Sequence, residues 1–283
     1  MNYVELNNGI KMPNLGIGTF MLQPTDAENS VREALKIGYR LIDTANAYVN
    51  ERAVGRGIKE SGVPREEIFV STKLWPTEYE NPTAVDETLE RLGLNYIDLL
   101  FLHQPGGNYK EGYKQLEKAY KEGKIKAIGI SNFFGKDLER LLANIEIMPQ
   151  VSQVERHPLF TGKSTNEDES FLKHNMKIMS WFPLCRCDKR VMKSDIIINL
   201  SKKYNKSVQQ IVIRWHIQKG YIPIPGSTKA EHIRDNFNVF DFELIEEDMK
   251  EIERLDIEYR FEKLKLLSRI FILFVFPIYE RKK

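Results

Sequence analysis

Short apolar runs alternate along this chain with longer segments in which hydrophobic residues recur at helical spacing. The apolar runs predict strands at residues 15–20, 41–43, 68–72, 97–102, 125–130, 151–154, 177–181 and 221–224. The segments between and after them predict helices at residues 27–37, 50–61, 82–92, 113–121, 136–144, 167–174, 194–204, 208–218, 231–237 and 246–255. Residues 3–6 and 10–12 flank an Asn-Asn-Gly turn, which predicts a β-hairpin ahead of the first of these strands.

This order of elements decides the fold class. Eight strands that alternate with helices over short connections predict an α/β fold, a (β/α)8 TIM barrel with an N-terminal β-hairpin and extra C-terminal helices. An open, doubly wound sheet is the alternative, but Gly16-Ile-Gly18 lacks the third glycine of a dinucleotide-binding turn. We expect one domain over residues 1–283, with an atypical tail at residues 259–283.

Composition changes this prediction little. The chain has 42 Lys and Arg against 40 Asp and Glu, and a net charge of +2 does not favour general binding to nucleic acid. Two cysteines do not provide a disulfide framework. The first residues lack the basic and apolar regions of a signal peptide, and no apolar run reaches the roughly 20 residues of a membrane span. We therefore expect a cytoplasmic protein with no integral membrane span.

Ionisable side chains follow three of the predicted strands. Asp43 ends the second strand, with Tyr48 five residues further on, and Lys73 and His103 directly follow the third and fourth strands. The carboxyl ends of barrel strands converge on one face, where active sites lie, so we expect these four side chains to form one site. Each alone has an ordinary interpretation, such as a helix cap for the acid, and the prediction therefore rests on the whole set.

The chemistry of this set suits proton donation. A tyrosine has a pKa of about 10, which is too high for ready proton transfer at neutral pH. Lys73 can lower it, Asp43 can orient Lys73, and His103 can position a carbonyl oxygen. The set predicts carbonyl reduction, with Tyr48 protonating the alkoxide that hydride attack produces. Two alternatives stay open: a Schiff base on Lys73 in an aldolase-like barrel, and a cofactor-binding barrel with a regulatory or interaction role.

Several motifs follow one another along the chain: Leu15-Gly-Ile-Gly-Thr19, Asp43-Thr-Ala-Asn-Ala-Tyr48, Ser71-Thr-Lys73, Gly129-Ile-Ser-Asn-Phe133, Gln153 and Ile224-Pro-Gly-Ser227. In this order they resemble the aldo-keto reductase family, from the opening hairpin to about Leu255. Leu102-His-Gln-Pro105 and Arg214-Trp215 resemble its prokaryotic, diketogluconate-reductase-like branch.

The resemblance implies a nicotinamide dinucleotide that lies across the barrel mouth without a separate binding domain. It places Ser131, Asn132 and Gln153 at the carboxamide group and Trp181 on the nicotinamide ring. The other cofactor positions that it implies are Thr19, Asp43, Leu184, Ser227, Thr228, His232 and Asn236. Around a small aldehyde or ketone it places Phe20, Val49, Trp75, His103 and Gln104.

Two positions depart from the family pattern in a way that concerns the cofactor. Gly226 and His232 stand where the family usually has a lysine and an arginine, the two cations that meet the 2′-phosphate of NADPH. Lys229 and Arg234 lie close by in sequence and can substitute for them. We expect NADPH as the cofactor, with NADH as the alternative.

Three further features complete the sequence-based prediction. Cys185-Arg-Cys187 replaces a small or glycine-bearing segment, and without companion ligands it predicts surface thiols and no metal site. His157 is expected to have a structural role in a loop. The apolar residues at 264–279 are expected to pack on the protein itself. We expect a monomer or a weak dimer.

Overall fold

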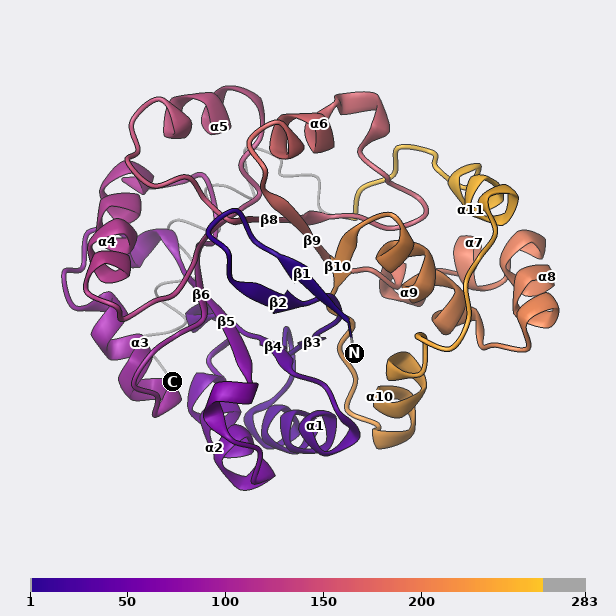
Figure 1. The fold of residues 1–283 in the computed structure, drawn as a ribbon, viewed down its shortest axis with the longest axis horizontal. Coiled ribbons are helices and arrows are strands. Elements are labelled where there is room, and N and C mark those ends of the chain that lie inside the picture. The colour runs from indigo at the N-terminus through magenta and orange to yellow at the C-terminus, as the bar shows by residue number, and fades with distance from the viewer. Residues whose placement is uncertain (1, 262–283) are drawn as a thin grey trace.

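The computed structural model describes residues 2–261, and an eight-stranded parallel sheet forms its centre (Figure 1). Its strands, in chain order, are β3 Ile17–Gly18, β4 Leu41–Asp43, β5 Phe69–Leu74, β6 Leu99–Leu102, β7 Ile128–Ser131, β8 Val151–Glu155, β9 Lys177–Trp181 and β10 Tyr221–Pro223. The Gly16 amide donates to the Pro223 carbonyl at 3.1 Å, and the Gly18 amide donates to the Pro225 carbonyl at 3.3 Å. The first and last strands therefore meet, and the predicted barrel is confirmed.

Helices surround the sheet, as Figure 1 shows. They are α1 Pro24–Ile37, α2 Glu51–Ser61, α3 Ala84–Leu92, α4 Tyr109–Lys121, α5 Gly135–Leu142, α6 Glu167–Leu172, α7 Lys189–Met192, α8 Asp195–Tyr204, α9 Val208–Gln218, α10 Ala230–Phe237 and α11 Glu246–Glu253. Two predicted helix starts were wrong by several residues. Helix α1 begins at Pro24, whose fixed φ suits a first helical turn, and α4 begins after Asn108, whose side chain accepts from the Glu111 amide.

The predicted hairpin closes the amino end of the barrel. Strands β1 Tyr3–Glu5 and β2 Lys11–Pro13 pair antiparallel, in front of the barrel strands in Figure 1. The Asn7 side-chain amide donates to the Pro149 carbonyl at 3.0 Å, and that of Asn8 donates to the Lys126 carbonyl at 3.1 Å. Pro149 and Lys126 lie just before β8 and β7, so the hairpin covers the amino ends of the barrel strands. The carboxyl ends of the strands, on the opposite side, remain open for a site.

The barrel interior is apolar next to the hairpin. Its buried side chains are Leu6, Met12, Leu41, Phe69, Leu99, Phe101, Ala127, Val151, Met179, Ile222 and Ile224. Phe101 fits because its neighbour on β7 is Gly129: a Cβ at that position would lie 2.2 Å from the Phe101 ring. This glycine is therefore required by the packing of the core.

Some local predictions differ from the structure. Strand β7 begins at Ile128, because Ile125 makes only an isolated bridge with Ile97, and the strand continues to Ser131 at the site. Asn50 precedes α2 but does not cap it with its side chain, which donates to the Thr19 carbonyl at 2.9 Å instead. Helix α7 was not predicted. Among residues 2–261, no helix is both long and apolar enough to cross a membrane, and the apolar tail at 264–279 lies outside the described residues.

Candidate active site

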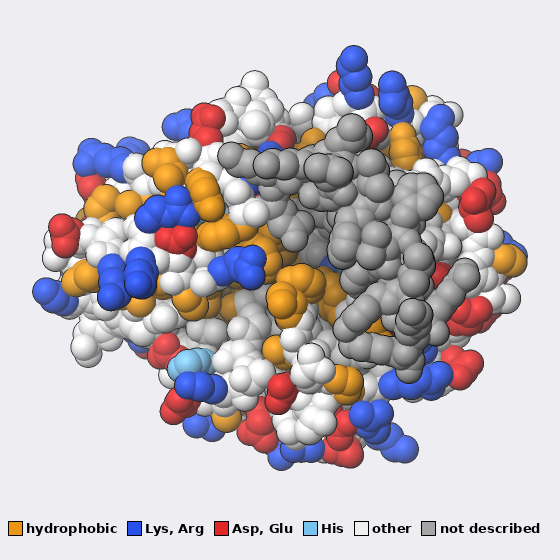
Figure 2. Space-filling model, turned by 180° about the vertical axis from the view of Figure 1, so that it is seen from behind, with side chains coloured by type: hydrophobic (Ala, Val, Ile, Leu, Met, Phe, Trp, Pro, Cys, Tyr) orange, Lys and Arg blue, Asp and Glu red, His pale blue; other side chains and the backbone are white. Residues whose placement is uncertain are grey.

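A cavity of about 450 Å³ opens at the carboxyl ends of the barrel strands. Figure 2 shows the side of the molecule that faces away from the hairpin, where hydrophobic side chains gather near the centre. The predicted site residues that line the cavity are Phe20, Asp43, Tyr48, Trp75, His103, Gln104, Ser131, Asn132, Gln153, Trp181 and Leu184. Side chains from most of the barrel strands, far apart in sequence, thus meet around one space.

A buried ion pair lies at the bottom of this cavity. Lys73 of β5 donates through Nζ to Asp43 Oδ2 at 2.6 Å and to the Thr44 carbonyl at 2.7 Å. The lysine side chain is 0% exposed and the aspartate side chain is 2% exposed. Asp43 Oδ1 accepts from Ser71 Oγ at 2.8 Å and from Gln153 Nε2 at 3.0 Å. Three side-chain donors therefore fix the carboxylate, and the carboxylate fixes the ammonium.

Burial changes the pKa values of the ionisable side chains in this region. It lowers the pKa of Lys73, and the negative charge of Asp43 opposes that shift. A second buried acid, Glu51 of α2, accepts from Thr72 Oγ1 and from Arg91 Nε, each at 2.6 Å. Burial raises the pKa of Glu51, and Arg91 opposes that shift. Two carboxylates thus favour a positive charge on Lys73 beside the cavity.

Tyr48 and His103 lie against this ion pair. The short helix Asn46–Tyr48 follows β4 and brings the Tyr48 ring to 4.9 Å from Lys73 Nζ. The His103 ring lies 5.8 Å from the Tyr48 ring and stands edge-on to Trp75 at 4.9 Å. Burial, followed by the charge of Lys73, lowers the pKa of His103 well below its ordinary value. His103 is therefore a neutral imidazole near pH 7 and offers one N–H to a ligand.

Polar side chains form a second group in the same cavity. Trp181 Nε1 donates to Asn132 Oδ1 at 3.1 Å, and Asn132 Nδ2 donates to Ser131 Oγ at 3.2 Å. Gln153 lies beside them in the neighbouring strand and donates to Asp43. Amide and hydroxyl groups at the buried end of a mostly apolar cavity, next to an indole ring, suit the carboxamide and the flat ring of a nicotinamide. The residues present therefore fit the cofactor that the sequence implies.

The remaining predicted site residues are not among the side chains that line the cavity within residues 2–261. Lys73 lies beneath its floor, and Thr19 is buried, with its hydroxyl donating to the Asp43 carbonyl at 3.1 Å. Val49 is 42% exposed in a left-handed conformation directly after Tyr48. The residues predicted around the adenosine phosphate follow β10, outside the cavity: Ser227, Thr228, His232 and Asn236.

On one wall of the cavity the sequence predicted Leu184, but not the neighbouring Phe182, Arg186 and Cys187. Cys185, Arg186 and Cys187 have φ values of 52°, 51° and 58°, which for L-residues cost roughly 1–2 kcal/mol each. The only signal of this turn in the sequence was that Cys185-Arg-Cys187 stands in place of a small or glycine-bearing segment. The prediction of surface thiols was wrong for Cys185, which is buried, whereas Cys187 is exposed. No group of three His, Cys, Asp or Glu side chains in residues 2–261 is placed to hold a metal ion.

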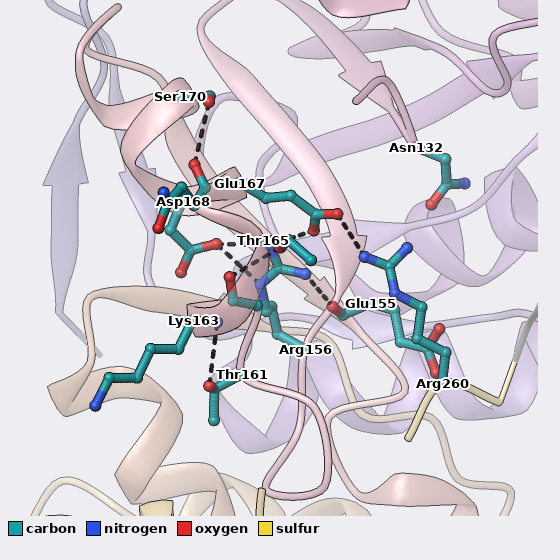
Figure 3. A network of polar contacts seen from close by, with 12 residues as sticks. Asn132, Glu155, Arg156, Thr161, Lys163, Thr165, Glu167, Asp168, Ser170 and Arg260 are labelled. Carbon is teal, nitrogen blue, oxygen red and sulfur yellow. Dashed lines mark hydrogen bonds and ion pairs between the residues drawn. The ribbon is translucent and has the colours of Figure 1, made fainter. Parts of the chain in front are cut away.

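The end of the described chain is fixed beside the same wall. Arg156 and Arg260 reach Glu167 from two sides, at 2.9 and 2.5 Å (Figure 3). The Phe261 amide donates to Glu155 Oε1 at 2.7 Å, and its ring lies 6.2 Å from Phe182. The same Glu155 oxygen lies 3.1 Å from His157 Nε2. His157 is thus a buried loop residue, as predicted, but with an acidic partner that the prediction missed.

The wall also rests on a buried histidine, which gives a first testable prediction. His216 Nε2 donates to the Pro183 carbonyl at 3.1 Å, and burial lowers the pKa of His216 to about 3. An unfolded histidine has a pKa of about 6.5, so below that pH the unfolded chain binds more protons and the free energy of unfolding falls as pH falls. We expect His216→Gln, whose amide can keep the bond to Pro183, to lose less stability on acidification.

Urea unfolding near pH 7 and at about pH 4.5 measures this difference. The matched control is His232→Gln, which alters a histidine that is 57% exposed and should leave the acid sensitivity unchanged. Equal losses of unfolding free energy in the His216→Gln variant and the unmodified protein would contradict the prediction.

Known proteins resemble this chain over most of its length. The model of the family described as the aldo/keto reductase family matches residues 14–257. The chain is 46% identical over 266 residues to the 9,11-endoperoxide prostaglandin H2 reductase of Trypanosoma cruzi, which covers 92% of this chain and 93% of the relative. It is 44% identical over 263 residues to the glyoxal reductase of Bacillus subtilis, which covers 91% and 94%.

A solved structure agrees with the fold, and named bacterial relatives agree with the predicted branch. An aldo-keto reductase of Bombyx mori, solved in complex with NADP, matches with a TM-score of 0.87 and 32% sequence identity, over 93% of this chain and 95% of that chain. The bacterial relatives include enzymes named glyoxal reductase and methylglyoxal reductase, in agreement with the predicted diketogluconate-reductase-like branch.

Proposed function

This chain belongs to the aldo/keto reductase family, and on that basis we propose that it reduces small 2-oxoaldehydes with NADPH and with Tyr48 as proton donor. Its relatives are reductases, so NAD(P)H-dependent reduction of a carbonyl compound is the activity of the chain, and a regulatory barrel without turnover finds no support among them. An aldolase-like role for Lys73 would leave the amide group formed by Asn132 and Gln153 without a purpose.

The observation that supports these roles best is the meeting of four side chains around one end of the cavity. The Tyr48 hydroxyl is the group that gives a proton to the substrate oxygen. Lys73, 4.9 Å from the Tyr48 ring, stabilises the phenolate that remains, and Asp43 holds the ammonium in place at 2.6 Å. Neutral His103 donates a hydrogen bond to the same substrate oxygen and so orients the carbonyl group.

The cofactor assignment rests on the polar group in the cavity. A bound reduced nicotinamide supplies the hydride. Ser131, Asn132 and Gln153 would hold its carboxamide, and Trp181 would lie against its ring. NADPH is the proposed form, a choice that the NADP-bound relative supports. NADH remains the second candidate, because Gly226 brings no side chain to the 2′-phosphate.

The substrate class follows from the rest of the lining. Phe20, Trp75 and Phe182 make that part of the cavity apolar, and Gln104 is a polar side chain near His103. A small molecule with two adjacent carbonyl groups can accept from His103 through one oxygen and from Gln104 through the other. The glyoxal reductase among the relatives supports this class. We further propose a single domain that acts in the cytoplasm as a monomer or weak dimer.

A substrate panel tests this proposal. The loss of reduced-nicotinamide absorbance is followed with glyoxal, methylglyoxal and phenylglyoxal, and with propanal and benzaldehyde as matched simple aldehydes. A hydrogen bond contributes roughly 0.5–1.5 kcal/mol net, and about 1.4 kcal/mol is a factor of ten, so we expect kcat/KM to be about twofold to tenfold higher for the 2-oxoaldehydes. Gln104→Leu should reduce that preference. Equal kcat/KM values for matched pairs would reject the proposed class, and a higher kcat/KM with NADH would reject the cofactor.

A further inference from the structure

One buried carboxylate near the cavity has no role in the proposed reaction. Glu51 is the first residue of α2, and its side chain is 2% exposed. Its Oε1 accepts from Thr72 Oγ1 and its Oε2 accepts from Arg91 Nε, each at 2.6 Å. An ionised carboxylate only accepts hydrogen bonds, and here both oxygens accept, one of them from a cation. The contacts therefore suit a buried negative charge at Glu51.

This charge lies next to Lys73 across a single strand. Thr72 and Lys73 are neighbours in β5, and successive side chains of a strand point to opposite faces of a sheet. Lys73 points into the barrel toward Asp43, so Thr72 points outward to the helices, where it meets Glu51. Two carboxylates thus act on one ammonium from opposite sides of the sheet.

The charged and titratable groups around Lys73 come from several elements. Burial lowers the pKa of Lys73, and the carboxylates of Asp43 on β4 and Glu51 on α2 oppose that shift. His103, which follows β6, is neutral because its own pKa is lowered well below the ordinary value. Tyr48 lies over the ammonium, with its ring 4.9 Å from Nζ. The acids are therefore the groups that offset the cost of burying this charge.

We propose that Glu51 is a positioning residue for proton transfer, whose carboxylate keeps Lys73 charged beside Tyr48 as the pH rises. The inference rests on the proposed function, which gives Lys73 and Tyr48 their roles. Arg91 holds Glu51 from the outside, since its side chain is 29% exposed between α2 and α3. The same ion pair also ties α2 to α3, so the test has to measure more than stability.

The pH profile of single-turnover reduction measures this role. Loss of the proton from Lys73 or Tyr48 ends reduction at high pH and so sets the alkaline limb of the profile. Glu51→Gln keeps the size of the side chain and removes its charge, so the ammonium loses its proton more readily. We expect the limb to move to lower pH by about one unit.

Arg91→Met tests the same contact from the surface. Burial raises the pKa of Glu51 and Arg91 opposes that shift, so without the guanidinium the acid becomes neutral more readily. The limb should then move in the same direction as in Glu51→Gln. The double variant Glu51→Gln/Arg91→Met should show no larger shift than Glu51→Gln alone, because Arg91 acts through Glu51. It leaves no unpaired charge from this ion pair and serves if a single variant does not fold.

Asp98→Asn is the matched control. Asp98 is also buried and also accepts from an arginine, Arg65 Nη2 at 2.6 Å, but it lies directly before β6, at the amino end of the barrel. Its replacement should lower the free energy of unfolding and leave the alkaline limb in place.

The outcomes are distinct. An unmoved limb in Glu51→Gln, or an equal shift in Asp98→Asn, overturns the inference. Shifts that add in the double variant also overturn it, because Arg91 would then act on Lys73 by itself. The profile uses whichever carbonyl compound of the panel is reduced fastest, so a rejection of 2-oxoaldehydes leaves this test intact. An unmodified protein without an alkaline limb would reject the proposed roles of Lys73 and Tyr48, and this inference with them.

Discussion

Replacement of Tyr48 by phenylalanine will lower kcat by about 10²–10⁴-fold, the usual contribution of a positioned proton donor. The ring, its contact with His103 and its position over Lys73 can all remain, because phenylalanine lacks only the hydroxyl. Binding of the dinucleotide should therefore be unchanged. Single-turnover reduction of a 2-oxoaldehyde measures the loss in the chemical step, and fluorescence quenching measures the affinity.

The matched control removes a buried phenol at a distance from the cavity. Tyr113 of α4 donates to the Ile147 carbonyl at 2.7 Å, and Tyr113→Phe should cost some stability but no turnover. If Tyr48→Phe keeps more than about a tenth of the original kcat, the proton reaches the substrate from another group and the proposed role of Tyr48 is wrong.

Replacement of Lys73 by methionine has the largest expected effect on stability. It leaves the Asp43 carboxylate buried without its cation, and removal of one partner of a buried ion pair typically costs about 3–5 kcal/mol of unfolding free energy. The double variant Asp43→Asn/Lys73→Met removes both charges and should recover most of that loss. Neither variant should reduce carbonyl compounds, because the ammonium beside Tyr48 is absent from both.

Urea unfolding and turnover, measured on the same preparations, separate the two roles of the pair. Lys250→Met serves as the control, because Lys250 pairs with Glu246 at 2.6 Å on the surface, where both side chains are well exposed and the pair contributes little. A double variant as unstable as Lys73→Met would show that the instability comes from the lost packing of the lysine stem. Turnover in the double variant would remove Lys73 from the mechanism.

The sequence was sufficient for the fold and for the centre of the cavity for a physical reason. Buried parallel strands appear in the sequence as short apolar runs. An ionisable residue at the end of such a run, such as Asp43, Lys73 or His103, is expected to lie at the open end of the barrel. The pairing of Lys73 with Asp43 at 2.6 Å was therefore foreseeable from residue types and strand ends alone.

The wall around Arg186 could not be predicted in the same way. Its shape depends on φ values that no residue preference indicates, because three consecutive non-glycine residues adopt a conformation that glycine favours. The burial of Cys185 depends on that turn, and the acidic partner of His157 depends on where β8 ends. The helix starts at Pro24 and Tyr109 were missed for two local reasons: the fixed φ of Pro24 suits a first helical turn, and the Asn108 side chain caps the helix that begins at Tyr109.

The hairpin at the amino end of the barrel limits the path by which reactants can enter. Leu6 and Met12 plug that end of the barrel, so the reactants have to use the mouth on the other side. Ser131, Asn132 and Gln153, which suit the nicotinamide, are buried, whereas Phe20, one of the aromatic side chains that suit the carbonyl compound, is 45% exposed. A carbonyl compound that arrived first would obstruct the path of the larger dinucleotide, so we expect the dinucleotide to bind first.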